Sequence, residues 1–209
     1  MASLRYYFEN TIIRPRRAFS ELLSDPRRLK HGFITFLIMV LLYTVGILFI
    51  AFSGAEPTMR PWLAIPSKNY YYWQTLFYAP VFITGWILAA GVVQLLSRLF
   101  KGNGTFEDTA SLLGFGIAVP TYVTLIPDMI EGFLAFLGII NQKEYTEFIT
   151  HPGLGQIFIW SLMLIELVWL IILFSVSVEK AQKLPWWKAG IIGTIGYIVY
   201  QLFLFIFIR

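Results

Sequence analysis

The 209-residue sequence contains no cysteine and few charged residues. The absence of cysteine excludes disulfides, zinc–thiolate sites and thiol nucleophiles, and it leaves the redox compartment unreadable. Asp, Glu, Lys and Arg make up only 13% of the chain, against about 25% in soluble domains, whereas 57% of the residues are hydrophobic. Because a soluble protein of this size has nowhere to bury so much apolar surface, the composition predicts an integral membrane protein.

Five runs of mostly apolar residues are each long enough to cross a bilayer as an α-helix, which needs about 20 residues. They cover approximately residues 32–52, 75–96, 109–138, 153–178 and 189–208, and none of them contains Lys or Arg. Since backbone polar groups in lipid must bond within their own segment, we expect an all-α membrane protein built as a bundle of five transmembrane helices. The chain then divides into a basic amphipathic cytoplasmic segment, residues 1–30, and a transmembrane domain, residues 31–209.

The distribution of basic residues predicts the orientation of this bundle. Four of the 16 Lys and Arg residues fall on one side of five alternating spans, and the other twelve fall on the opposite side. The four are Arg60, Lys68, Lys143 and Arg209. Because cytoplasmic loops carry the excess of Lys and Arg, we expect the N-terminus in the cytoplasm and the C-terminus outside.

Two short amphipathic helices are predicted in the N-terminal segment. Apolar residues recur at helical spacing within residues 4–11, and they form one face of residues 15–23, where Pro15 is suited to the first turn. The basic residues beside these faces are Arg14, Arg16, Arg17, Arg27 and Arg28. Such a tail suits an anionic cytoplasmic leaflet. Packing of the tail on the protein's own cytoplasmic face is equally open.

The loop after the second span contains Lys101-Gly102-Asn103-Gly104. This is not a phosphate-binding loop, because the order of Gly and Lys is wrong and no strand precedes it. Asn103-Gly104 predicts a turn, and Thr105 predicts the N-cap of the next helix. We take Lys101, Gly102 and Gly104 as candidate contacts for a cytoplasmic partner.

Three acidic residues lie inside the predicted spans without a cation in any span. Asp128 lies about 28 Å along the third span, near the outer edge of the apolar core, and Glu131 follows it by one turn. Glu166 lies about 15–20 Å along the fourth span, near the midplane. Together with Thr124, these acids form a candidate intramembrane polar or cation site. For Glu166 we favour a structural acid hydrogen-bonded to a neighbouring Tyr or Thr, with a proton or cation site as the alternative.

Enzyme chemistry finds little support in the sequence. The two histidines, His31 and His151, fall at opposite faces of the predicted bundle, so they do not share a metal. The sequence has neither the G-x-S-x-G motif of hydrolases nor the H-E-x-x-H motif of metalloproteases. We therefore expect no enzymatic activity, no metal, no cofactor and no nucleic-acid partner.

Pairs of small residues four apart in two spans favour close helix packing. These are Gly85 with Ala89 and Ala189 with Gly193. Packing within one chain is the favoured use, and homo-oligomerisation is the alternative.

Several segments resemble the Yip family, the Ypt/Rab-interacting membrane proteins and their prokaryotic relatives. These are RPRRAF at 14–19, LFKGNGTF at 99–106, LLGFG at 112–116, and the loop at 178–189. The resemblance implies a cytoplasmic N-terminus, five clustered helices and a non-enzymatic role. Eukaryotic members also carry a DLYGP-type motif near the second span, and this sequence has none. Binding to a Rab-type GTPase is therefore unsupported, and the short tail is more similar to a prokaryotic member of the cytoplasmic membrane.

The resemblance implies a membrane-organising or partner-binding factor of trafficking type. Its expected contacts are the lipid bilayer, anionic lipids at the cytoplasmic face, and an unidentified membrane or cytoplasmic protein. The alternative function is a small transporter, a channel, or a proton- or cation-linked membrane subunit that uses Glu166.

Overall fold

The computed structural model describes residues 3–57 and 62–208. Arg60 and Arg209, which enter the charge count above, lie outside these ranges. Within them the chain is helical and contains no β-strand. The α-helices are α1 (Leu4–Ile13), α2 (Pro15–Leu23), α3 (Arg28–Phe52), α4 (Tyr70–Leu99), α5 (Phe106–Phe136), α6 (Gln142–Thr150), α7 (Leu154–Gln182) and α8 (Trp186–Phe207). A short 3-10 helix, η1 (Ser67–Asn69), precedes α4.

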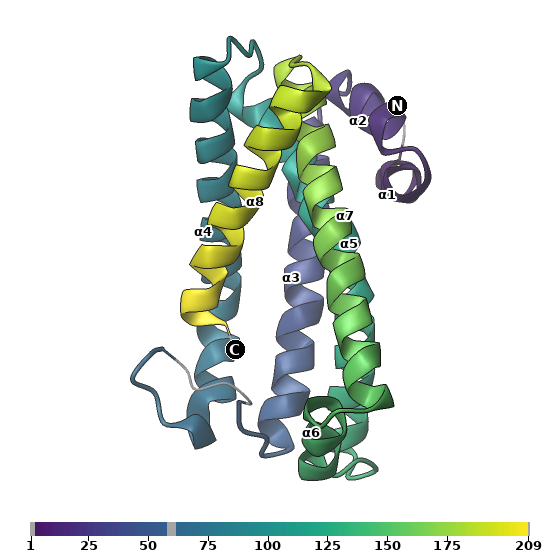
Figure 1. Cartoon of the computed structure of the whole chain (residues 1–209), viewed down its shortest axis with the longest axis vertical. Coiled ribbons are helices and arrows are strands. Elements are labelled where there is room, and N and C mark those ends of the chain that lie inside the picture. The colour runs from purple at the N-terminus through teal and green to yellow at the C-terminus, as the bar shows by residue number, and fades with distance from the viewer. Residues whose placement is uncertain (1–2, 58–61, 209) are drawn as a thin grey trace.

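Five of the described helices, α3, α4, α5, α7 and α8, are long and apolar enough to cross a membrane. They run along the long axis of the molecule (Figure 1). The helices α1 and α2 and the loops at 100–105 and 183–185 lie at one end, which we call the basic end. The short helix α6 lies at the opposite end, which we call the far end. The predicted all-α membrane bundle with two amphipathic N-terminal helices is confirmed.

Glycines bring α3 and α5 into backbone contact near the basic end. A Cβ atom added to Gly32 would lie 2.8 Å from the Cα of Ser111, and one added to Gly114 would lie 2.7 Å from the carbonyl carbon of Gly32. Real side chains do not tolerate such distances, so these positions require glycine. The Arg28 guanidinium joins the same two helices through Asp108, with Nε and Oδ1 2.6 Å apart.

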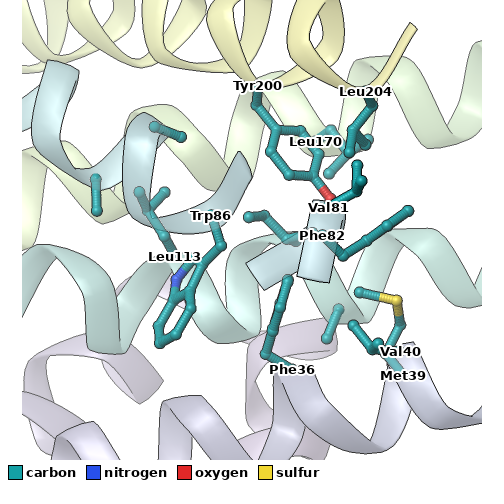
Figure 2. Close-up of a cluster of buried hydrophobic side chains, with 14 of the residues drawn as sticks. Phe36, Met39, Val40, Val81, Phe82, Trp86, Leu113, Leu170, Tyr200 and Leu204 are labelled. Carbon is teal, nitrogen blue, oxygen red and sulfur yellow. The ribbon is translucent and has the colours of Figure 1, made fainter. Parts of the chain in front are cut away.

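The core between the spans is aliphatic and aromatic. Figure 2 shows its side chains converging from α3, α4, α5, α7 and α8, with the ring of Tyr200 extending from α8 into the cluster. Trp86 stacks on Phe36 with ring centres 5.1 Å apart, and its indole N–H donates to the Ala110 carbonyl at 3.1 Å. The polar edge of this large ring is therefore satisfied inside the membrane, as burial of tryptophan requires.

Both predicted pairs of small residues pack inside the chain. The Cβ position of Gly85 on α4 is 3.3 Å from the Phe203 ring on α8, and Ala89 is buried. Ala189 is also buried, and the Cβ position of Gly193 is 2.7 Å from the Cα of Ser175 on α7. These residues therefore let α8 lie close to both α4 and α7.

The N-terminal helices pack on the protein itself, which is one of the two arrangements left open by the sequence. Their apolar faces are buried against the ends of α5 and α7. The residues of this contact are Tyr7, Ala18, Phe19, Leu22, Leu112, Phe115, Val176 and Ala181. Arg16 of α2 also pairs with Glu179 of α7 at 3.1 Å. The tail is thus a docked cap on the basic end.

Candidate functional site

A cavity lies among the five long helices, around the predicted acidic site. Its volume is about 310 Å³. The lining residues are Tyr43, Tyr78, Phe82, Thr121, Thr124, Asp128, Ile159, Leu162, Met163, Glu166, Leu170, Tyr200, Gln201, Leu204, Phe205 and Ile208. Thr124, Asp128 and Glu166, three of the four residues predicted to form the site, therefore line one cavity.

Glu166 occupies the middle of α7, twelve positions after the start of the helix at Leu154, or about 18 Å along its axis. Its carboxyl accepts a hydrogen bond of 2.6 Å from the Thr124 hydroxyl of α5. The side chain is half-buried. A carboxyl at this depth requires a hydrogen bond, a proton or a cation, and Thr124 supplies the first of these.

Asp128 follows Thr124 by one turn of α5, about 6 Å along the helix axis. Its carboxyl accepts a hydrogen bond from the Tyr43 hydroxyl of α3 at 3.3 Å. Glu166 and Asp128 are thus held by different helices at two levels of the same cavity wall.

Glu131 is the predicted site residue that does not line the cavity. Its carboxylate accepts a hydrogen bond from the Gln142 amide, at the start of α6. The sequence analysis did not foresee α6, a nine-residue helix that Asn141 caps by accepting from the Lys143 backbone N–H at 3.0 Å. Glu131 therefore joins α5 to α6 at the far end.

Tyr78 is a cavity residue that the sequence analysis missed. Its side chain is 0% exposed, and its hydroxyl has no hydrogen-bond partner within the described part of the chain. The ring is fixed by stacking on Phe82 at 4.2 Å and on Tyr43 at 5.3 Å. A buried hydroxyl without a hydrogen-bond partner costs about 1–3 kcal/mol of folding stability, so Tyr78 is an unsatisfied polar group in the wall of the cavity.

Tyr200 and Gln201 of α8 also line the cavity and were not foreseen. Gln201 offered a signal, because it is a lone amide within an apolar run. Tyr43 and Tyr197 also lie near the acids, whereas the exposed Thr84 hydroxyl donates to the Pro80 carbonyl on its own helix at 2.7 Å.

A second cavity of about 480 Å³ adjoins the first between α7 and α8. Its lining residues are Trp160, Met163, Leu164, Glu166, Leu167, Leu170, Tyr197, Ile198, Gln201, Leu202 and Phe205. Glu166 and Gln201 are the polar residues common to both cavities. Across residues 3–57 and 62–208, no group of three or more His, Asp or Glu side chains is arranged to hold a metal ion.

The loop at 100–105, at the basic end, is held in place by three neutral polar side chains. The Gln182 amide of α7 donates to Gln94 of α4 at 2.6 Å and to Thr109 of α5 at 2.7 Å, and the Gln94 amide donates to the Gly104 carbonyl at 3.0 Å. Gly102 is buried beside Ser97 and Gln182. These contacts fold the loop tightly against the end of α7.

The three candidate loop contacts occupy different environments. Gly102 and Gly104 are buried, and a Cβ on Gly104 would lie 2.7 Å from the Ala181 carbonyl carbon. Lys101 is exposed, with a left-handed φ of 66°. Of the three, only Lys101 is exposed.

The tail is anchored through Asp25, which is 5% exposed. Its carboxylate accepts from the Arg27 backbone N–H at 2.8 Å and from the Tyr7 hydroxyl at 3.2 Å, and it lies 3.6 Å from Nε2 of His31. The Arg27 N–H lowers the pKa of Asp25, and burial opposes this effect. Asp25 therefore stays ionised and connects α1 to the start of α3.

The five predicted surface arginines also differ. Arg14, Arg16, Arg17 and Arg27 are exposed, although Arg16 pairs with Glu179 and Arg17 with Glu21. Arg28 is less exposed and serves the contact between α3 and α5.

Comparison with known proteins identifies a family. No curated protein and no solved structure shows significant similarity to the chain. The family model described as Yip1 domain matches residues 10–208, which is nearly the whole chain. The helical architecture and this match agree with the resemblance drawn from the segments at 14–19 and 99–106. The chain belongs to the Yip1 domain family of membrane proteins.

Proposed function

We propose that this protein is a non-enzymatic membrane organiser that presents its basic end to a partner at the cytoplasmic surface of a prokaryotic cell membrane. The positive-inside distribution supports this orientation, with the C-terminus outside. The observation that carries the proposal is the docked tail: burial of Phe19 and Leu22 against the bundle leaves a preformed surface rich in arginine and lysine.

The surface of the basic end combines contributions from three segments. Arg14 and Arg17 come from the tail, Lys101 from the loop after α4, and Lys183 from the loop after α7, and all four are exposed. Trp186, 73% exposed, follows Lys183 by three positions in the sequence. Exposed cations with a nearby aromatic side chain suit an acidic segment of a protein partner or the anionic leaflet around it.

Crosslinking and affinity purification from native membranes test this proposal. We expect one reproducible partner with the wild-type chain, and its loss with the charge reversals Arg14→Glu, Arg17→Glu and Lys101→Glu combined. The matched control reverses Lys68 and Lys143, which the topology places on the other side. Recovery of the same partner from all three proteins, or of none from the wild type, would reject the proposal.

A second candidate function is a proton- or cation-linked role for Glu166. The observation that favours it is that Glu166 and Asp128 line one cavity that no Lys, Arg or His lines. Proteoliposomes with an imposed pH gradient test it: we expect dissipation that is lost in Glu166→Gln and kept in Glu147→Gln, an exposed acid of α6. Equal leak in all three samples would count against this role.

A further inference from the structure

The cleft between α7 and α8 reaches from the acidic cavity to the surface that faces lipid. The two cavities share Met163, Glu166, Leu170, Gln201 and Phe205. Three other residues lining the outer cavity are largely exposed, namely Trp160, Leu164 and Leu202. Figure 1 shows α7 and α8 close together at the basic end and apart toward the far end. The cleft therefore admits an occupant from the side, out of the bilayer.

The outer part of the cleft suits an alkyl chain. Apart from Glu166, Tyr197 and Gln201, the lining of the outer cavity is aliphatic, aromatic or thioether. Volumes of about 310 and 480 Å³ fall within the range of sites for small organic ligands.

The inner part has the polarity expected for a cationic head group. The Glu166 and Asp128 carboxyls both line this cavity, and Asp128 follows Thr124, the donor to Glu166, by one turn of α5. The buried Tyr78 hydroxyl lines the same cavity without a hydrogen-bond partner in the described ranges. Carboxylates in such a medium call for a compensating positive charge. A primary ammonium has three N–H donors, which matches three oxygen acceptors.

We infer that the cleft between α7 and α8 binds a lipophilic primary amine, with its alkyl chain along the outer cavity and its ammonium group between Glu166, Asp128 and the Tyr78 hydroxyl. A phospholipid is a poorer occupant, because its phosphate would meet two carboxyls and no lining cation. A free fatty acid is disfavoured for the same reason. This inference rests on the cavity of the second candidate function and names the class of ligand.

Photolabelling of the purified protein in phosphatidylcholine nanodiscs tests this inference. The probes are three alkyl diazirines of equal chain length that end in an amine, a hydroxyl or a carboxylate. We expect the amine to label peptides from α7 and α8 about tenfold more than the carboxylate does, which corresponds to ~1.4 kcal/mol of discrimination. Glu166→Gln should reduce amine labelling about as much, because Gln keeps an acceptor for Thr124 but lacks the charge.

Two further variants make the result decisive. Glu147→Gln on α6 is the matched control and should label like the wild type. Ile198→Trp fills the outer cavity and should exclude the alkyl chain of every probe. Equal labelling by the three probes, or unchanged amine labelling in folded Glu166→Gln, would overturn the inference.

The outcome also separates this inference from the second candidate function. Amine labelling that depends on Glu166, without proton leak in liposomes, supports the binding site and rejects proton linkage. Leak that depends on Glu166, without selective amine labelling, rejects the binding site and keeps proton linkage.

Discussion

The Thr124 hydroxyl on α5 and the Glu166 carboxyl on α7 lie 2.6 Å apart and form a hydrogen bond inside the membrane. The two residues are 42 positions apart in the chain, so this contact exists only because α5 and α7 pack side by side. It fixes the rotamer of the deepest acid and thereby the polar wall of the cavity.

Thr124→Val should destabilise the bundle, because it keeps the shape of the side chain but leaves the Glu166 carboxyl without its donor. We expect a loss of about 1–3 kcal/mol, the cost of an unsatisfied buried polar group. Thermal unfolding in detergent measures the effect, with Thr124→Ser as the variant that restores the donor. Equal stability of the Val and Ser variants would show that the bond contributes nothing.

Protonation of Asp25 in acid should release the N-terminal tail from the bundle. The pKa of this carboxyl is lowered by the Arg27 backbone N–H, so its contribution is fully present above the ordinary aspartate pKa of about 4 and is lost as pH falls through the lowered value. A spin label on a cysteine at Ser20, the only thiol in that variant, reports mobility of α2.

The label should be immobile at pH 7 and become mobile only in strong acid. In Asp25→Asn it should already be mobile at pH 7, whereas Glu9→Gln, on the exposed side of α1, should follow the wild type. Immobility of the label in Asp25→Asn at neutral pH would contradict the assigned anchor.

Gly104→Ala should be poorly tolerated. The new methyl group would meet the backbone of Ala181, which cannot move without displacing the end of α7. Overpacking of this kind costs about 1–3 kcal/mol. The control is Gly91→Ala on α4, where no atom outside the local helix backbone lies within 4 Å of the added Cβ. This alanine should stabilise the helix by up to about 1 kcal/mol. A similar unfolding temperature for both variants would contradict the close packing of the loop.

Single cysteines should report opposite membrane sides at the two ends of the bundle. Because the chain has no native cysteine, Ser20→Cys and Glu147→Cys each introduce a unique and exposed thiol. In intact cells, an impermeant maleimide should label residue 147 and spare residue 20, and lysis should make both reactive. Labelling of both positions in intact cells, or of residue 20 alone, would overturn the proposed orientation.

The helices were predictable because their signals are local. An apolar run such as residues 32–52 must form a helix in lipid whatever its neighbours do, and Pro15 suits the first turn of α2. The capping box at Thr105 and Asp108 is likewise local, with each residue bonding the backbone N–H of the other. These features need no knowledge of how the helices cross.

The site was predictable only in part, because it depends on those crossings. The depth of Glu166 followed from counting residues, but the identity of its donor required the arrangement of α5 and α7. The spacing from Asp128 to Glu131 placed both on one face, whereas α6 draws the second of these acids away through Gln142. Tyr78 escaped notice because tyrosine is common in this chain and its lack of a partner appears only in three dimensions.

The contact among Gln94, Thr109 and Gln182 joins three helices without any formal charge. Mobile ions screen exposed ion pairs such as Arg17 with Glu21, but they leave amide and hydroxyl dipoles almost unaffected. None of these three groups gains or loses a proton across the physiological range. The packing of α4, α5 and α7 at the basic end should therefore be the same at high and at low salt concentration. The docking of the tail on this end should instead vary with salt concentration, because exposed ion pairs are screened.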